Sequence, residues 1–145
     1  MIEVKVINKS PYPLPEYKTK GSAGMDLRAN IDCEVVINPH ERVLIPTGLF
    51  LGIPEGYFGG IYPRSGMSLK VGLSNANAIG VIDSDYIGEV GIIALNTSNN
   101  PIKVSPGDRI AQIIFQKYEE CNWILVDKLE DTERGAGGYG HTGTN

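Results

Sequence analysis

The sequence predicts a single all-β domain, a sandwich or a barrel with one short helix. Three observations carry this prediction. Short apolar runs recur about every 8–12 residues, a spacing typical of antiparallel strands rather than of alternating strands and helices. Eighteen glycines and nine prolines provide the turns between them. A chain of 145 residues with 41% hydrophobic residues is long enough for one domain with a substantial core.

The expected strands follow one another along the chain. Ile2, Val4 and Val6 alternate with charged residues, which is the pattern of a half-buried strand. Further apolar runs bounded by turn residues predict strands over 33–37, 42–46, 49–53, 57–62, 78–82, 89–95, 102–104, 109–115 and 123–126. Only the stretch "RSGMSLK", Arg64 to Lys70, suggests a helix, and that helix is short.

The chain ends in a different composition. The stretch "RGAGGYGHTGTN", Arg134 to Asn145, holds five glycines, and glycine loses more backbone freedom on ordering than any other residue. We therefore expect a β domain over 1–133 and a flexible glycine-rich arm over 134–145. The arm formally matches the dinucleotide fingerprint GxGxxG, but no helix can open after it, so the match is accidental.

Composition excludes several classes of function. A net charge of -4 argues against nucleic-acid binding, and two histidines cannot form a histidine-rich metal cage. No apolar run approaches the ~20 residues of a membrane helix. The N-terminus lacks the pattern of a signal peptide, so we expect a cytoplasmic protein in which Cys33 and Cys121 stay reduced.

Four stretches carry polar residues that a turn alone does not require. Asp26 lies between two apolar residues, and an outward strand position explains it as well as a function does. Ser65 fits a helix N-cap better than an anion site. Asp83 and Asp85 fit a β-turn or a catalytic pair. Gln112, alone in an apolar run, needs a hydrogen-bond partner, either the backbone or a ligand.

Together these stretches resemble the homotrimeric dUTP pyrophosphatase (dUTPase) family. Its five motifs occur in order between about residues 22 and 143, as "AGMDLRA", "PRSGMSLK", "GVIDSDYIGEVG", "GDRIAQIIF" and "RGAGGYGHTG". The resemblance implies a distorted jelly-roll-like β fold and three active sites shared between subunits. It also implies hydrolysis of dUTP to dUMP and pyrophosphate with Mg²⁺.

The resemblance also implies a role for each matching residue. Asp83 activates the water that attacks the α-phosphorus, and Tyr86 packs on the sugar and excludes a 2'-hydroxyl. Asn77 and the backbone up to Gly80 recognise uracil. Contacts to the phosphates come from Arg64, Ser65, Gly66 and Gln112. Asp26 acts on water around Mg²⁺ without touching the metal. In the arm, Tyr139 stacks on uracil and Arg134 pairs with the γ-phosphate.

Some residues depart from the family pattern. His141 and Thr142 replace a frequent Ser-Thr pair, and Ile87 stands where arginine is common. Three rival functions are open at this point: a dCTP deaminase or bifunctional deaminase on the same scaffold, a nucleotide-sensing or protein-interaction module, and a structural β domain. The first rival uses a glutamate where this chain has "VIDSDY".

Overall fold

The computed structural model describes residues 1–138 and contains ten strands and one helix over that range. The elements in chain order are β1 (Lys5–Asn8), β2 (Met25–Arg28), β3 (Val35–Ile37), β4 (Arg42–Gly52), β5 (Tyr57–Pro63), α1 (Ser65–Lys70), β6 (Leu73–Asn75), β7 (Gly80–Ile82), β8 (Glu89–Asn96), β9 (Ile102–Val104) and β10 (Arg109–Lys117). The all-β class with one short helix, predicted from the sequence, is confirmed.

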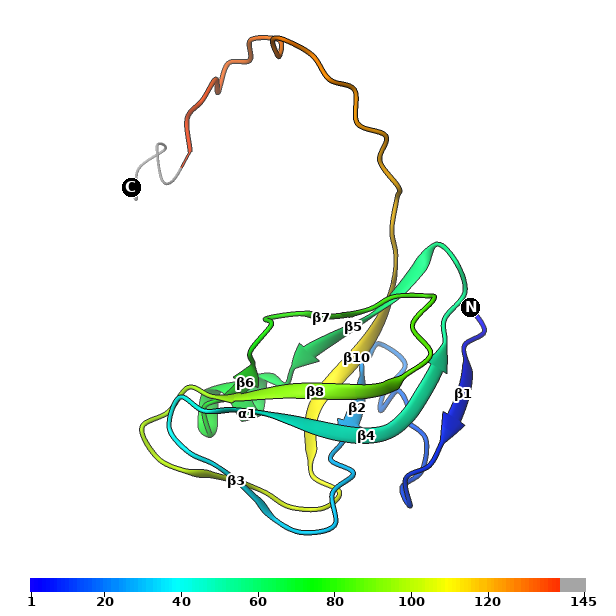
Figure 1. Ribbon diagram of the computed structural model, residues 1–145, viewed down its shortest axis with the longest axis vertical. Coiled ribbons are helices and arrows are strands. Elements are labelled where there is room, and N and C mark those ends of the chain that lie inside the picture. The colour runs from blue at the N-terminus through cyan, green and yellow to red at the C-terminus, as the bar shows by residue number, and fades with distance from the viewer. Residues whose placement is uncertain (139–145) are drawn as a thin grey trace.

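Two four-stranded antiparallel sheets form the body, as Figure 1 shows. The first sheet has the order β1-β4-β8-β6 and the second the order β2-β10-β5-β7, while β3 and β9 form a separate two-stranded sheet. The core is one cluster of buried aliphatic side chains contributed by both large sheets, among them Ile45 and Ile92 from the first and Leu27, Ile61 and Ile113 from the second. Alternation along each strand leaves the other face of the second sheet for polar residues.

Two predicted strands in the first sheet are in fact one. The strands predicted over 42–46 and 49–53 are separated by Thr47 and Gly48, which predict a turn, but β4 runs through this stretch with an irregularity between Pro46 and Phe50. Gly48 has φ +73°, and its N–H donates to Oε1 of Glu89 at 2.7 Å. The hydroxyl of Thr47 donates to the carbonyl of Val90 at 2.6 Å. Because these bonds replace the missing ladder bonds, the strand bends without ending.

The prediction of a strand over 123–126 is wrong for this structure. After β10 the chain leaves the sheets and runs away from the body as an extended segment (Figure 1). Its apolar side chains face solvent, with Trp123 90% and Leu125 100% exposed. A strand needs a neighbour for its N–H and C=O groups, and residues 1–138 of one chain offer none to this segment.

The first strand is also shifted from its expected place. Ile2 and Val4 are half-buried as the alternation predicts, but Val6 is exposed and pairing with β4 begins only at Lys5. Within residues 1–138, no helix is long and apolar enough to cross a membrane.

Candidate active site

The outer face of the second sheet gathers polar side chains from three strands. β10 lies between β2 and β5, and Gln112 is directly opposite Asp26 on one side and Tyr62 on the other. Side chains that are directly opposite in neighbouring strands share a face. The sequence alone does not predict this meeting, because it needs the pairing of three strands far apart in the chain.

A β-bulge adds Arg109 to this face. The register of β10 against β2 shifts between Arg109 and Ala111, so that Ile110 is an extra residue. Ile110 and Ala111 are both buried, although neighbouring strand residues normally point to opposite faces. Arg109 consequently lies on the same side as Gln112, three residues away, which a regular strand would forbid.

Asp26 joins two arginines at this bulge. Its Oδ1 lies 2.8 Å from Nε of Arg64, and its Oδ2 lies 3.1 Å from a terminal guanidinium nitrogen of Arg109. Arg64 also donates to the carbonyl of Arg109 at 2.6 Å. The Asp26 side chain is 20% exposed, so these charge-assisted bonds are only partly screened by water.

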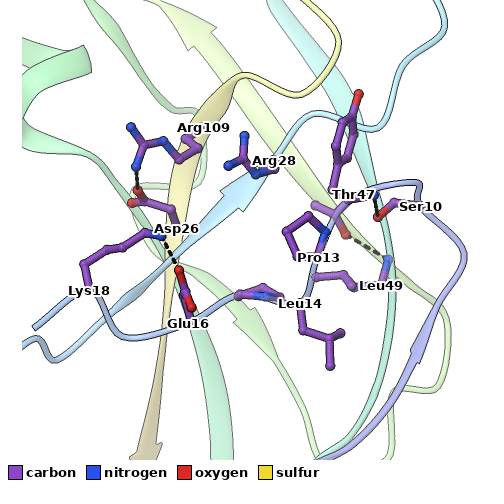
Figure 2. Close-up of a pocket in the computed structure, with 12 residues that line it drawn as sticks. Ser10, Pro13, Leu14, Glu16, Lys18, Asp26, Arg28, Thr47, Leu49 and Arg109 are labelled. Carbon is purple, nitrogen blue, oxygen red and sulfur yellow. Dashed lines mark hydrogen bonds and ion pairs between the residues drawn. The ribbon is translucent and has the colours of Figure 1, made fainter.

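A small pocket opens beside this trio, and Figure 2 shows Asp26 and Arg109 facing one another at its edge. The loop before β2 also lines this pocket, and there Glu16 pairs with Lys18 beside Asp26 (Figure 2). The Lys18 ammonium lowers the pKa of the Glu16 carboxyl through a hydrogen bond and its charge. Both side chains are exposed, so this pair contributes little to stability.

Arg64 stands at the junction of β5 and α1. It is the N-cap residue of the helix, with extended φ of -92° and ψ of 127°, and Ser65 is the first helical residue. The interpretation of Ser65 as an N-cap is therefore wrong, and within the described chain no side chain caps α1. A Cβ on Gly66 would meet no atom within 4 Å, so the space above this turn is open.

Gln112 finds its partner in the backbone. Its Nε2 donates to the carbonyl of Pro63 at 3.0 Å, immediately before Arg64. Its Oε1 lies over Gly24, where a Cβ would come within 2.6 Å of that oxygen. One hydrogen bond thus holds the amide beside β5, and the lack of a side chain at residue 24 leaves room for its oxygen.

The next two candidate residues are Asn77, in the loop between β6 and β7, and Gly80, the first residue of β7. Gly80 is buried, and the position of a Cβ there would be 3.0 Å from Nδ2 of Asn77. Ala78 has φ +59°, and its N–H donates to the carbonyl of Asn75 at 3.1 Å. Asn75 is itself buried and donates to the carbonyl of Ile61 at 3.1 Å, which fixes the loop on β5.

Asp83 and Tyr86 share one turn after β7. The N–H of Tyr86 donates to the carbonyl of Asp83 at 3.2 Å. Asp83 is exposed and lines an open hollow of ≈ 620 Å³ with Glu55, Asp85 and Tyr118. Both carboxylates of the turn, Asp83 and Asp85, thus line the same hollow.

One chain does not bring these two groups of residues together. Ile82 pairs with Gly59 in β5, so Asp83 lies level with Phe58, whereas Gln112 is level with Tyr62. At the rise of a β-strand the four steps from Phe58 to Tyr62 span about 13 Å, and the six steps from Phe58 to Arg64 about 20 Å. The carboxylate of Asp83 and the cationic cluster therefore occupy opposite ends of the second sheet.

Arg134 lies far along the extended segment that follows β10. Its Nε donates to the carbonyl of Gly137 at 2.8 Å, within a turn of the segment itself. Tyr139, and with it His141 and Thr142, lies outside the described residues.

Sequence reasoning missed three residues of this site: Arg109, Gly24 and Gly88, where a Cβ would lie 2.5 Å from the hydroxyl oxygen of Tyr86. Regular alternation along β10 would place Arg109 and Gln112 on opposite faces of the strand, and no pattern in the sequence predicts the bulge. Each of the two glycines lies in a motif, but its contact with a neighbouring side chain depends on tertiary structure. No group of three or more histidine, cysteine, aspartate or glutamate side chains able to hold a metal occurs among the described residues.

Comparison with known proteins gives these features a context. A family model described as dUTPase matches residues 10–143. The chain belongs to the dUTPase family. It is 52% identical to the deoxyuridine 5'-triphosphate nucleotidohydrolase of Finegoldia magna, over 98% of this chain and 99% of that protein. It is 46% identical to the enzyme of the same name from Fusobacterium nucleatum, over 98% and 97% of the two chains.

Solved dUTPase structures share the fold. The dUTPase of Staphylococcus bacteriophage 80alpha, solved with dUPNHPP, superposes with a TM-score of 0.88 at 27% identity, over 99% of this chain and 100% of the other. A mutant dUTPase from phage phi11 of S. aureus has a TM-score of 0.79 at 25% identity, over 90% and 100%, and that structure shows the coordination of a structural Mg(II) ion. The single-domain all-β architecture of this chain is thus a dUTPase architecture.

Proposed function

We propose that this protein hydrolyses dUTP to dUMP and pyrophosphate. The observation that carries the proposal is that one chain of the dUTPase family has both a cluster of two arginines around Asp26 and an accessible carboxylate at Asp83. The reaction would limit uracil incorporation into DNA and supply dUMP for thymidylate synthesis. Relatives at 46–52% identity carry the name of this activity, whereas none of the rival functions has comparable support.

Binding of the triphosphate would fall to the cluster around Arg64. An arginine has five N–H donors, and the bonds to Asp26 and to the Arg109 carbonyl leave most of those of Arg64 for phosphate. Ser65 and Gly66 follow it at the open start of α1, where backbone N–H groups have no partner within the helix. Gln112 would turn its amide from the carbonyl of Pro63 to the α-phosphate.

Hydrolysis needs a base beside the α-phosphorus. Asp83 would accept a proton from water as the water attacks, and the bond from phosphorus to the α,β-bridging oxygen would break, releasing pyrophosphate. Uracil would bind the loop of Asn77 and Gly80, where the close approach of side chain and backbone leaves little room for an added methyl group. Tyr86, on the same turn as Asp83, would lie against the deoxyribose.

These assignments require more than one chain. Gln112 and Asp83 must both reach the same phosphorus, yet the strand register separates them by about 13 Å along β5. A site that combines the Arg64 cluster of one subunit with the Asp83 turn of another removes the conflict. The exposed segment with Trp123 and Leu125 supports assembly, because large apolar side chains in water mark a surface that a partner covers. We therefore propose the homotrimer with shared active sites.

The glycine-rich arm would complete the site. The segment that leads to the arm runs away from the sheets of its own chain (Figure 1), so Arg134 would serve a site built by other subunits. There Arg134 would pair with the γ-phosphate and Tyr139 would stack on uracil, and closure would exclude bulk water.

Magnesium fits the residues present in a specific way. The described residues offer no cluster of ligands that could hold the ion, and the Asp26 carboxylate is already engaged by two arginines. This suits a cation held by phosphate oxygens and water, with Asp26 accepting a hydrogen bond from that water. When bound, Mg²⁺ would offset negative charge on the phosphates. Cytoplasmic location and the absence of nucleic-acid or membrane partners stay predictions from the sequence.

The decisive experiment measures pyrophosphate release from dUTP with Mg²⁺, for the natural protein and for Asp83→Asn. We expect the substitution to lower kcat by roughly 10²–10⁴ because the base is lost. Asp85→Asn, a neighbouring exposed carboxylate, should retain most of the rate. Ammonia release from dCTP, or an unimpaired Asp83→Asn variant, would contradict the proposal.

A further inference from the structure

The side chain of Tyr86 lies over the residues that follow it in the chain, Gly88 and Glu89. Its hydroxyl donates to the carbonyl of Glu89 at 2.9 Å, while its backbone N–H is bonded to the carbonyl of Asp83. The hydroxyl restrains the ring and the N–H restrains the backbone, although Tyr86 is 45% exposed to solvent. An exposed tyrosine normally moves among several rotamers, so this restraint calls for an explanation.

Gly88 provides the space in which the ring lies. A Cβ at this position would come within 2.5 Å of the Tyr86 hydroxyl oxygen, 2.6 Å of Cζ and 2.9 Å of Cε2. Gly88 is not among the residues with positive φ, so its backbone conformation does not demand glycine. What demands glycine is the ring, since any side chain here would displace it.

The carbonyl that anchors the hydroxyl is itself well placed. Glu89 begins β8 opposite Phe50 of β4, and its Oε1 accepts the N–H of Gly48 at 2.7 Å. That bond ties Glu89 to the irregular part of β4. The anchor of the Tyr86 ring is thus part of the first sheet and not of a free loop.

We infer that Gly88 and the Glu89 carbonyl form a seat for the Tyr86 ring and thereby set the preference for deoxyribose over ribose. This inference rests on the proposed function, in which the ring lies against the sugar. A ring that is held in one position leaves no room for a 2'-hydroxyl, whereas a ring that can move yields to it. Gly88 and Glu89 are positioning residues, because they act through Tyr86 and not on the nucleotide.

The test compares kcat/KM for dUTP and for UTP in the full-length protein and in Gly88→Ala. We expect the dUTP-to-UTP ratio to fall by at least roughly tenfold, through a higher KM for dUTP and a gain of UTP hydrolysis. The melting temperature should change little, because the clash involves only the end of an exposed side chain. Gly21→Ala is the matched control, since a Cβ there meets no atom within 4 Å.

A second background shows whether the effect passes through the ring. In Tyr86→Ala the ratio should fall, and adding Gly88→Ala should then change it by less than about twofold, because no ring remains to be displaced. The same fold-change in both backgrounds would overturn the inference, as would a Gly88→Ala variant with the natural ratio. If Gly88→Ala does not fold, Tyr86→Phe decides, since it breaks only the bond to Glu89. A lowered ratio supports the seat, and an unchanged one overturns it.

The two levels of proposal fail in different ways. If Tyr86→Ala keeps the natural ratio, the role of the ring on the sugar is wrong and the seat falls with it. If the natural protein releases no pyrophosphate from dUTP, the proposed function itself is wrong.

Discussion

Asp26 and Arg64 form an ion pair of 2.8 Å between Oδ1 and Nε, although they come from β2 and from the end of β5. Arg109 approaches the second oxygen of the same carboxylate. One negative charge thus lies between two positive ones, and the trio keeps a net positive charge. Such a surface attracts a polyanion while the carboxylate fixes the direction of both guanidinium groups.

Replacing Arg109 tests this balance. Arg109→Gln leaves the pair of Asp26 with Arg64 but removes one cation, so we expect KM for dUTP to rise roughly five- to tenfold with a smaller change in kcat. The free energy of unfolding should fall by only about 1 kcal/mol, because the pair is partly exposed. Steady-state kinetics and thermal melting measure both effects. Arg42→Gln, an exposed arginine on β4, is the control, and an equal KM in the two variants would refute the role of Arg109.

Gly24 is expected to control the position of Gln112. A methyl group at residue 24 would lie 2.6 Å from Oε1 of Gln112, so Gly24→Ala should push the amide away and lower kcat by roughly tenfold or more. In a Gln112→Ala background the same substitution should have little further effect on the rate. A Gly24→Ala variant that is slow in the natural background and equally impaired without Gln112 would point to a backbone distortion instead.

Mixing two inactive variants tests the shared site. In the proposed shared site, Asp83→Asn and Arg64→Gln should each disable a different half, so a mixed trimer of the two variants should have about one quarter of its sites intact. Unfolding and refolding the two variants together should therefore recover activity that neither variant has when refolded alone. Persistent inactivity of a mixture that analytical ultracentrifugation shows to be trimeric would mean that each site belongs to one chain.

Removing the arm separates assembly from catalysis. A chain without residues 134–145 retains all described strands and the apolar residues Trp123 and Leu125, so it should fold and assemble like the full chain. Its turnover of dUTP should be far slower, since Arg134 and Tyr139 are lost. Circular dichroism, ultracentrifugation and pyrophosphate release monitor the three properties. Undiminished turnover would eliminate the role of the arm.

The sequence predicts those strands well whose pairing partners and core contacts lie within the same chain. Periodicity and turn residues located β5, β8, β9 and β10 closely, because these strands bury one face against the core of their own chain. The stretch from Trp123 to Val126 has the same composition and forms no strand, because pairing depends on a neighbour that the sequence does not name. The turn predicted at Thr47 and Gly48 is wrong because glycine occurs in β-bulges as well as in turns.

The candidate site could be predicted only in part. Gln112 stood out because a single amide in an apolar strand needs a partner, and the structure provides one at Pro63. Arg109 did not stand out, since its face is decided by an extra residue in β10 and not by its own chemistry. Gly24 and Gly88 matter because they lack a side chain. This is evident only from the structure, which places Gln112 next to Gly24 and Tyr86 next to Gly88.

The extra residue at Ile110 shifts by one residue the alternation of inward and outward side chains along β10. Upstream of it an odd-numbered residue, Arg109, looks outward, and downstream an even-numbered one, Gln112, does so. Deleting Ile110 would restore uniform alternation and leave Arg109 and Gln112 on the outer face, with the loss of one buried aliphatic side chain, whereas a strand that kept Ile110 without the bulge would turn the guanidinium into the aliphatic interior. The outward direction of Arg109 therefore depends on the bulge itself and not on the type of side chain at positions 109 and 112.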